Sequence, residues 1–309
     1  MINEKIFITG GAGFLGRNLV ERVYKDNEIT VYSRDEAKHY YMKKDYPLIK
    51  FVVGDIRNKD YLIRKSKGHT IGIFAASLKQ IEACNDNYEE AAKTIVDGGF
   101  NSRLAAEENN FKAACFISTD KSRAATTLYG AMKYVAGEGF IVGDSNCKLT
   151  TAIYGNVTNS TGSVIPLIWS FINKSETLSL YGAEMTRFLL DVEDAVNLIM
   201  KSTSYEGCAI IPIAQSFKVK DLFDIYRKRF GLKYVITEPR AGEKIHEIMA
   251  SSEEIRRMEL IREDNIYLLH PQKDINEVSF RHNEYSSRDH CLTRDQLYDY
   301  LESKNFYRS

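Results

Sequence analysis

The segment FISTDKSRAATTLYGAMKYV, residues 116–135, holds four side chains that can exchange protons. Tyr129 and Lys133 are one helical turn apart, so in a helix they share one face. A phenol is a poor base at neutral pH because its pKa is about 10, and a nearby positive charge favours the phenolate and lowers that pKa. Asp120 and Lys121 precede them as a second pair. The segment therefore predicts a site at which several side chains can transfer protons.

A glycine-rich segment near the start of the chain predicts a dinucleotide site. FITGGAGFLGRNLV places Gly10, Gly13 and Gly16 between the first expected strand and the first expected helix, with Phe14 and Leu15 in the same turn. Glycine permits a tight turn and a close approach of the backbone to a pyrophosphate, which helix N–H groups attract. A plain packing turn is the alternative, but the strand-helix context favours the cofactor.

The end of the second expected strand favours NADP over NAD. An NAD site usually places Asp or Glu there to hold the ribose 2′-hydroxyl, whereas this chain has Ser33 and Arg34, followed by Lys38. A hydroxyl and a guanidinium suit a 2′-phosphate, because arginine can grip it with paired charge-assisted hydrogen bonds. Asp35 and Glu36 keep open the alternative of a solvated charge cluster.

Two further strand ends contribute to the predicted cofactor site. Asp55 is expected to accept a hydrogen bond from the adenine amino group, with Ile56 beside it. Ala75 and Ala76 offer small side chains where the nicotinamide half must lie against the backbone. These residues follow strands, so we expect them at one edge of a sheet, where such folds bind ligands.

The elements that must position these residues alternate between strands and helices through the first half of the chain. Strands are expected at KIFITG, EITVYS, IKFVVGD, TIGIFAA, ACFIST and LTTAIYG, and helices most clearly at 13–25, 88–109 and 128–143. This alternation predicts an α/β fold with a Rossmann-type doubly wound parallel sheet. We expect a cofactor domain over 1–155 and a smaller mixed α/β substrate domain over 156–309, with some of its segments returning to the first sheet.

Composition restricts the partners and the compartment. Of 309 residues, 44% are hydrophobic, and 42 basic residues balance 42 acidic ones, so neither nucleic acid nor a membrane surface is favoured as a partner. The five cysteines show no zinc-binding spacing, and no metal is expected. No apolar run approaches a membrane span and no signal region precedes the first strand, so we expect a cytoplasmic protein.

Together the glycine loop, Tyr129 and Lys133 resemble the extended short-chain dehydrogenase/reductase superfamily. Longer segments resemble its inverting UDP-N-acetylglucosamine 4,6-dehydratase (5-epimerising) family of polysaccharide biosynthesis. These segments are AASLKQIEACNDNYEEAAKTIV, ISTDKSRAATTLYGAMK, YGNVTNSTGSVIPL, GAEMTRFLLDVEDAV, RAGEKIHEIMASSEE and EYSSRD. The likeness runs in order over most of the chain. Enzymes that retain the C5 configuration carry Asp-Glu where this chain has Asp120 and Lys121.

The resemblance implies a reaction. Tyr129 would take the O4 proton while hydride passes from C4 of the sugar to NADP, and the same tightly bound cofactor would return hydride to C6. Lys121 would act as the C5 base and Asp120 as the acid for the departing C6 hydroxyl, with Thr119 and Lys133 completing the catalytic set. Reprotonation of C5 on the opposite face would give UDP-2-acetamido-2,6-dideoxy-β-L-arabino-hexos-4-ulose. The division of roles between Asp120 and Lys121 stays open, as does a purely structural salt bridge.

The resemblance also implies a UDP-sugar site. The residues that correspond to it are Lys79, Asn156, Ser163, Val164, Thr186, Arg187, Arg240 and Glu243. Arg187 and Arg240 suit a pyrophosphate because they carry charge-assisted donors, and the Glu243 carboxylate suits ribose hydroxyls. His246, by contrast, is expected to pack rather than to react. The superfamily likeness further implies a homo-oligomer, a dimer or higher, built through the helices expected at 88–109 and 128–143.

Departures from the family pattern and rival functions stay open. The loop SRAATTL lacks a family proline and asparagine, Ile153 replaces an arginine, and Phe74 replaces a histidine, which leaves open an altered sugar preference or slower turnover. A retaining 4,6-dehydratase should carry Glu at position 121, and a UDP-sugar 4-epimerase would need no Asp-Lys pair. An NADP-binding redox-sensor module is the non-enzymatic alternative, although such modules commonly lose the tyrosine or the lysine.

Overall fold

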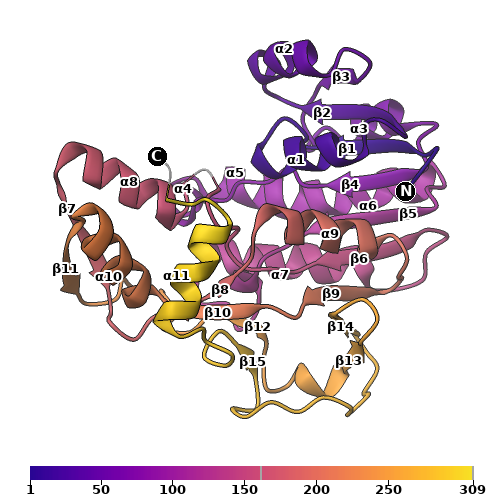
Figure 1. The fold of residues 1–309 in the computed structure, drawn as a ribbon. Coiled ribbons are helices and arrows are strands. Elements are labelled where there is room, and N and C mark those ends of the chain that lie inside the picture. Colours follow the sequence, from indigo (N-terminus) through magenta and orange to yellow (C-terminus); the bar gives the residue numbers. More distant parts are fainter. Residues whose placement is uncertain (161, 308–309) are drawn as a thin grey trace.

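The computed structural model describes residues 1–160 and 162–307, and a single large sheet organises them. In the described chain the sheet has the strand order β13-β14-β9-β6-β5-β4-β1-β2-β3 (Figure 1). The strands are β1 Lys5–Thr9, β2 Glu28–Ser33, β3 Lys50–Val53, β4 Ile71–Phe74, β5 Ala113–Ile117, β6 Lys148–Ala152, β9 Cys208–Pro212, β13 Met258–Ile261 and β14 Ile266–Leu269. Strands from β9 to β3 pair in parallel, and β14 pairs antiparallel with both β9 and β13. The predicted doubly wound α/β fold is therefore confirmed.

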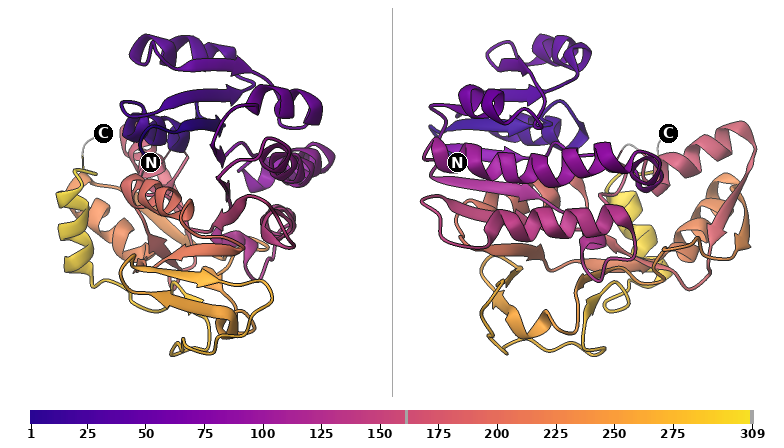
Figure 2. Two further views of the ribbon diagram at one scale, coloured as in Figure 1. Left: turned by 90° about the vertical axis from the view of Figure 1, so that its right-hand side faces the viewer. Right: turned by 180° about the vertical axis from the view of Figure 1, so that it is seen from behind.

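Helices cover both faces of this sheet. Helices α1 (Phe14–Val23) and α9 (Val192–Ser202) lie on one face, and α6 (Gly98–Glu108) and α7 (Leu128–Ile141) lie side by side on the other (Figures 1 and 2). Successive side chains of a strand point to opposite faces. The central strands β4 and β5 are buried along their whole length, which explains their continuous apolar runs.

Alternation along β1 shows how the two faces are filled. Phe7 joins the hydrophobic cluster that contains side chains of α6 and α7, whereas Ile6 and Ile8 join the cluster that contains side chains of α1 and α9. All three side chains are at most 1% exposed. Strand β1 is thus tightly packed on both faces, and the glycine loop follows directly from this well-packed strand.

The helix expected over 88–109 is present and its backbone is helical throughout, but its hydrogen-bond register changes in the middle. Helix α5 (Tyr88–Ala92) passes into a π-helical turn at Lys93–Asp97 before α6 begins. In such a turn the backbone hydrogen bonds span five residues instead of four, and the apolar periodicity of a sequence does not reveal it.

Three further helices belong to this half of the chain: α2 Glu36–Asp45, α3 Lys59–Ser66 and α4 Ile81–Asp86.

The second part of the chain adds short sheets and helices, most of which surround a core of their own, while β12 and β15 pack on the core of the main sheet. The short strands are β7 Thr177–Tyr181, β8 Thr186–Leu189, β10 Gln215–Lys218, β11 Lys233–Thr237, β12 Ile248–Ala250 and β15 Tyr285–Ser286, and the helices are α8 Val164–Lys174, α10 Val219–Phe230 and α11 Arg294–Ser303. A third hydrophobic cluster, which includes Phe217, Tyr226 and Leu297, fills this region. Strands β9, β13 and β14 come from this part of the chain but lie in the main sheet. The boundary at residue 155 stays a prediction.

One glycine brings the two proton-transfer pairs together. Helix α7 begins at Leu128, and the side chain of Thr127 caps it by accepting a hydrogen bond of 3.2 Å from the Gly130 amide. A Cβ atom added at Gly130 would lie 2.2 Å from the carbonyl oxygen of Lys121. Because glycine lacks that atom, the first turn of α7 packs directly on the short 3₁₀ turn Asp120–Ser122.

The outer surface of α6 and α7 exposes apolar side chains. Phe100, Leu104, Tyr134 and Val135 are each between 38% and 48% exposed. These two helices are the ones through which the sequence predicts a dimer, and the dimer stays a prediction. Within the described chain, each helix is too short or too polar to cross a membrane.

We expect Val135→Glu to shift the protein toward the monomer. Val135 is 48% exposed, so a carboxylate is tolerated in the single chain, but it would be costly to bury against a second copy. Light scattering coupled to size-exclusion chromatography gives the mass. Val235→Glu on β11 is the matched control, because Val235 is 50% exposed, and it should leave the mass unchanged. A wild-type monomer, or an oligomer that Val135→Glu does not alter, would contradict the predicted interface.

Candidate active site

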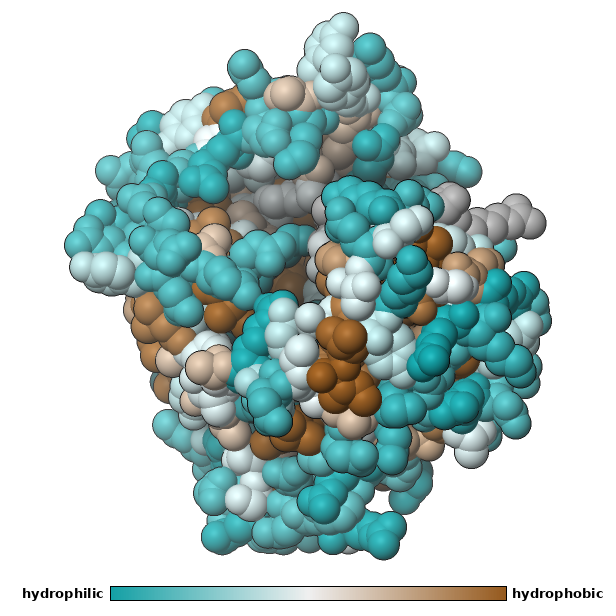
Figure 3. Space-filling model, turned by 90° about the vertical axis from the view of Figure 1, so that its left-hand side faces the viewer, coloured by the Kyte–Doolittle hydropathy of each residue, from teal (hydrophilic) through white to brown (hydrophobic). Residues whose placement is uncertain are grey.

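A cavity of about 1070 Å³ lies along the carboxyl ends of the parallel strands. Loops after β1, β2, β4 and β5 line it, at the point where the strand order reverses between β1 and β4. Parallel α/β sheets bind ligands at such a point. In the space-filling view the surface on this side is hollowed near its centre (Figure 3). A second cavity of about 180 Å³ adjoins the first and shares Lys121 and Asn156 with it.

The glycine loop forms one wall of the large cavity, as its residues Gly10, Gly13, Phe14, Leu15 and Gly16 all line it. Gly10 has a φ of +69°, and a Cβ atom there would lie 2.9 Å from the amide nitrogen of Ala76. A Cβ atom at Gly16 would lie 2.4 Å from the Cα of Gly11. The first turn of α1 contains no acidic residue, so its free N–H groups are available to an anion. The loop fits a bound pyrophosphate.

The residues predicted to select NADP lie together at one end of this cavity. The Ser33 hydroxyl is 2.6 Å from Nε2 of His39, and the Lys38 ammonium is 2.8 Å from Oδ2 of Asp35. The Asp35 carboxylate also caps α2 by accepting from the Lys38 amide at 2.9 Å. Arg34 keeps a side chain that is 57% exposed at the cavity. Arg34 is therefore the most readily available donor for a phosphate, whereas Ser33 and Lys38 would have to exchange their protein partners for it.

Asp55 lies in the cavity wall but is strongly bound to the protein itself. Its carboxylate accepts from Nη2 of Arg57 at 2.6 Å and lies 3.8 Å from Nη1 of Arg34. Burial raises the pKa of Asp55, but its hydrogen bonds with Arg57 outweigh that effect and leave the pKa below its usual range. Ile56, Ala75 and Ala76 also line the cavity. The predicted adenine contact of Asp55 stays a prediction.

Tyr129 and Lys133 reach the cavity from the same face of α7. They are 6% and 4% exposed, and the Lys133 ammonium donates a hydrogen bond of 2.7 Å to the carbonyl of Ile117. Burial raises the pKa of Tyr129 to about 12 and lowers that of Lys133 to about 7. The neighbouring cation that lowers the pKa of Tyr129 against this burial is Lys121, and a hydrogen bond with Thr119 acts in the same direction. Lys121 therefore affects the phenol as well as its own pair.

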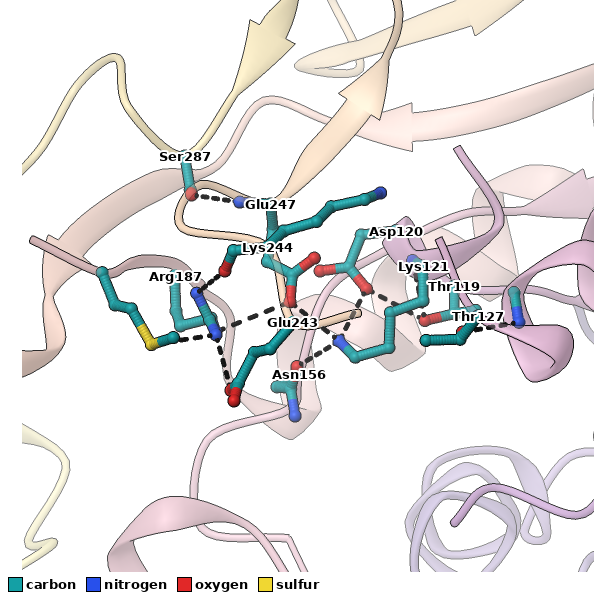
Figure 4. A network of polar contacts seen from close by, with 12 residues as sticks. Thr119, Asp120, Lys121, Thr127, Asn156, Arg187, Glu243, Lys244, Glu247 and Ser287 are labelled. Atoms are coloured by element: carbon teal, nitrogen blue, oxygen red, sulfur yellow. Dashed lines mark hydrogen bonds and ion pairs between the residues drawn. The ribbon is translucent and has the colours of Figure 1, made fainter. Parts of the chain in front are cut away.

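Lys121 lies at the centre of a polar network (Figure 4). Its Nζ atom is 3.3 Å from Oδ1 of Asp120, 3.0 Å from Oδ1 of Asn156 and 3.2 Å from Oε1 of Glu247. The Thr119 hydroxyl donates to Asp120 Oδ1 at 3.0 Å. Asp120 and Glu247 are only 1% and 3% exposed. Two buried carboxyl groups thus share one ammonium.

The three charges shift one another's pKa values in different directions. Burial raises the pKa of Asp120, and Glu247 raises it further, although Lys121 opposes both. Burial also raises the pKa of Glu247, but Lys121 and Arg187 outweigh it and the pKa falls below its usual range. Burial lowers the pKa of Lys121, but Asp120 and Glu247 outweigh it and the pKa rises. Burial and Glu247 therefore disfavour the ionised form of Asp120, whereas the charged forms of Lys121 and Glu247 stabilise each other.

The second carboxyl oxygen of Asp120, Oδ2, has open space in front of it because residue 155 is a glycine. In the described chain Oδ2 of Asp120 is buried and accepts no hydrogen bond from the protein. A Cβ atom at Gly155, in the segment YGN, would lie 3.0 Å from it. The space in front of this oxygen therefore depends on the absence of a side chain at Gly155. A buried carboxyl group with a raised pKa and a free oxygen can act as an acid toward a ligand.

The predicted substrate residues divide between the two cavities. Lys79, Asn156 and Ser163 line the large cavity, whereas Arg187, Arg240 and Glu243 line the small one with Asn156. The hydroxyl of Ser163 is buried without a partner in the described chain, so it is available to a ligand. Val164 begins α8 and lines neither cavity.

Thr186 also lies outside the lining of both cavities. Its hydroxyl is 2.8 Å from Nδ1 of His246 and 2.7 Å from the hydroxyl of Ser287. These contacts give His246 a packing role in the loop before β12. The substrate-binding role of Thr186 stays a prediction.

The two predicted pyrophosphate arginines differ in availability. The guanidinium of Arg187 donates to the carbonyls of Thr186 and Lys244 at 2.7 and 3.2 Å and to Glu243 at 3.1 Å. Arg240 is 53% exposed, lies 4.1 Å from the ring centre of Tyr181 and is 3.2 Å from Glu82. Arg240 can therefore turn to a phosphate easily, whereas Arg187 must first exchange protein partners.

The departures from the family pattern are absorbed by packing. Ile153 and Phe74 are at most 1% exposed and join the core. In the loop SRAATTL, Arg123 is fully buried and donates to Glu138 at 2.8 Å and to Glu254 at 2.7 Å. In the described chain no three His, Cys, Asp or Glu side chains are grouped so that they could hold a metal ion.

Sequence reasoning did not select Glu247. It belongs to the segment RAGEKIHE, from which Arg240 and Glu243 were chosen, but its partner Lys121 lies 126 residues earlier. The signal that could have identified Glu247 is that it carries a carboxylate within a segment already assigned to ligand binding.

The parallel sheet, the glycine loop at its switch point and the Tyr-Lys helix beside it are those of an extended short-chain dehydrogenase/reductase. Residues 6–269 match the family model described as polysaccharide biosynthesis protein, and the chain belongs to that family. It is 34% identical over 268 residues to a UDP-N-acetylglucosamine 4,6-dehydratase (inverting) from Campylobacter jejuni, a match that covers 82% of this chain and 80% of the relative. It is 32% identical over 278 residues to a UDP-glucose 4-epimerase from Rickettsia bellii, covering 84% and 81%. The X-ray structure of Pen from Bacillus thuringiensis matches with a TM-score of 0.90 at 22% identity and covers 99% of both chains.

We expect the stability of the protein to respond to pH through Lys133. Its pKa is lowered to about 7 in the folded chain, whereas an unfolded chain keeps a lysine pKa of about 10.4. Between these values the unfolded state binds more protons, so stability rises with pH. Chemical denaturation between about pH 7 and pH 9, without added nucleotide, should show the wild type gaining roughly 1 kcal/mol per pH unit relative to Lys133→Met. A constant difference between the two proteins would contradict the lowered pKa.

Proposed function

We propose that this protein is a UDP-N-acetylglucosamine 4,6-dehydratase that inverts C5. The product would be UDP-2-acetamido-2,6-dideoxy-β-L-arabino-hexos-4-ulose, a precursor for deoxy-amino-sugar glycans. The observation that carries this proposal is the position of Lys121, whose ammonium lies between Asp120 and Glu247 at the junction of the two cavities. The inverting dehydratase from Campylobacter jejuni, 34% identical to this chain, supports it.

NADP is the proposed cofactor. The glycine loop would hold its pyrophosphate, and Ser33, Arg34 and Lys38 would hold its 2′-phosphate at the far end of the cavity. When bound, it would accept hydride from C4 of the sugar and return it to C6. Because the same molecule is oxidised and reduced in one turnover, no net redox change would occur.

Tyr129 would remove the proton from the sugar O4. The positive charge on Lys121 lowers the pKa of this buried phenol, and the Thr119 hydroxyl helps. Lys133, with a pKa lowered to about 7, would hold the end of α7 against β5 through its bond to the Ile117 carbonyl. A positive nicotinamide beside Tyr129 would favour the phenolate further.

Asp120 and Lys121 would carry out the elimination. Because its pKa is raised, Asp120 can hold a proton and give it to the departing C6 hydroxyl from the oxygen that Gly155 leaves free. Lys121 would remove the C5 proton once its own proton has passed to solvent, a transfer that its raised pKa opposes. Return of a proton to C5 from the opposite face would invert that carbon.

A UDP-sugar 4-epimerase is the second candidate, because a UDP-glucose 4-epimerase from Rickettsia bellii is 32% identical over 84% of this chain. An epimerase would use Tyr129 in the same way and would return hydride to C4. The epimerase reaction gives the Asp120–Lys121–Glu247 network no proton to transfer, and for that reason we favour the dehydratase.

Incubation of the purified protein with UDP-N-acetylglucosamine separates these functions by mass. We expect a product lighter by one water, whereas an epimerase would give an isomer of equal mass and a redox sensor would give no product. Tyr129→Phe should lower the rate by about 10²- to 10⁴-fold, the usual contribution of a general base, while calorimetry shows unchanged NADP binding. An isomer of equal mass, or full activity of Tyr129→Phe, would contradict the proposal.

We expect Lys121→Glu to spare NADP binding and to disrupt inversion at C5, because a carboxylate replaces the amine that faces this carbon. Proton NMR in deuterium oxide reports both the exchange of the C5 hydrogen and, through coupling constants, its configuration. Lys148→Glu is the control for the change of charge, because Lys148 is exposed at the start of β6, at the amino ends of the parallel strands and away from the cavity. Unchanged stereochemistry in Lys121→Glu would remove Lys121 from its role.

A further inference from the structure

Glu247 approaches Lys121 from the side of the small cavity. Its Oε1 atom is 3.2 Å from Nζ of Lys121 and 3.5 Å from Nε of Arg187 (Figure 4). Glu247 lines the small cavity, whereas Tyr129 lines only the large one. Lys121 lines both cavities, so it lies between Tyr129 in the large cavity and Glu247 in the small one.

The backbone of Glu247 is fixed as firmly as its side chain. Its amide donates to the hydroxyl of Ser287 at 2.9 Å, and the Ser287 amide donates to the Glu247 carbonyl at 2.8 Å. The next residue begins β12, which packs beside the turn Asp120–Ser122. A rigid carboxylate therefore faces Lys121, rather than a surface side chain that pairs with it by chance.

The second oxygen of Glu247 is unusual. Oε2 is buried and has no hydrogen-bond partner in the described chain, and the side chain is only 4% exposed. A buried ionised carboxylate with one unpaired oxygen is unfavourable unless it serves a neighbouring charge or a ligand. The ammonium of Lys121 compensates the charge through the other oxygen, Oε1, and Oε2 stays available to a ligand.

We propose that Glu247 is a positioning residue of this site: it fixes the Lys121 amine between Asp120 and Asn156. A fixed carboxylate at this distance also favours the charged form of that amine. The role rests on the proposed function, because it concerns the amine assigned to C5. If Asp120 were its only carboxylate partner, the Lys121 side chain would be held only by the residue next to it in the chain. Glu247 supplies a second one from a distant segment and so defines where the Nζ atom lies.

All charged and titratable groups that face Lys121 enter this balance. They are Asp120 from the same 3₁₀ turn, Tyr129 from α7, Arg187 from β8, and Lys244 and Glu247 from the loop before β12. Asp120, Glu247 and Tyr129 raise the pKa of Lys121, whereas burial and Arg187 lower it. Replacing Glu247 with a neutral side chain removes one of the two main groups that raise this pKa, so the pKa of Lys121 must fall.

The test is the pH profile of C5 hydrogen exchange in wild type, Glu247→Gln and Glu247→Asp. The rate of exchange should rise with pH as Lys121 loses its proton, and we expect Glu247→Gln to move this ascending limb to lower pH by about 1 unit or more, the usual effect of one neighbouring charge. Glu247→Asp, which keeps the charge, should restore the limb toward the wild-type position. Superimposed profiles, or a uniform loss of rate with an unmoved limb, would overturn the proposal.

A direct titration keeps this inference separate from the proposed function. In protein with isotope-labelled lysine side chains, the Lys121 signal is identified by its loss in Lys121→Met, and its pKa is read by NMR without any substrate. It should be lower in Glu247→Gln than in wild type, and an unchanged pKa would overturn the role of Glu247 even in an active dehydratase. Conversely, a lowered pKa in a protein that does not dehydrate UDP-N-acetylglucosamine would refute only the proposed function.

Glu138→Gln is the matched control for both measurements. Glu138 also shares a cation with a second carboxylate, since Arg123 donates to Glu138 at 2.8 Å and to Glu254 at 2.7 Å. The same change from carboxylate to amide is thus made on another buried ion pair. We expect it to leave the pH limb and the Lys121 signal in their wild-type positions, and a shift equal to that of Glu247→Gln would overturn the specific role of Glu247.

Discussion

The ammonium of Lys121 is shared between two buried carboxyl groups, and the chemistry of the site depends on how protons are distributed among these three groups. A buried charge is stable only where opposite charges and hydrogen bonds replace water. Asp120 and Glu247 satisfy that condition at 3.3 and 3.2 Å, and Asn156 adds an uncharged acceptor at 3.0 Å. The pKa values of the two carboxyl groups move in opposite directions: burial and Glu247 raise that of Asp120, whereas Lys121 and Arg187 lower that of Glu247. Two carboxyl groups with oppositely shifted pKa values and one ammonium therefore lie within one hydrogen-bonded group.

The fold brings this group to the sheet edge through features that are local and steric. The turn that carries Asp120 and Lys121 follows the fully buried β5, and Gly130 lets α7 pack directly on it. Tyr129 is thereby held close enough to Lys121 for the charge to lower the pKa of the phenol. On the other side, the loop before β12 brings Glu247 to the same amine. The glycines at the site are therefore needed for close approach, since each makes room for a neighbouring group.

Sequence reasoning predicts the parts of this arrangement that local patterns encode. The strand-helix alternation gives the α/β fold, and the spacing of Tyr129 and Lys133 places both on one face of a helix, as observed. The π-helical turn at Lys93–Asp97 and the contact between Lys121 and Glu247 were not predicted, because hydrogen-bond register and long-range contacts leave no periodic signal. The family likeness identified the segment that contains Glu247, but it could not show which of its side chains turns toward the amine. The roles of the individual site residues stay predictions.

The central claim is that the Lys121 amine, fixed from behind by Glu247, faces C5 of the hexose. A crystal structure with NADP and UDP-N-acetylglucosamine, determined on the slow variant Tyr129→Phe, tests it most directly. The account predicts that Nζ of Lys121 lies about 3 to 3.5 Å from C5, the separation of a reacting pair, and keeps its contact with Glu247. An ammonium turned toward the pyrophosphate or toward solvent, with C5 facing another side chain, would contradict it.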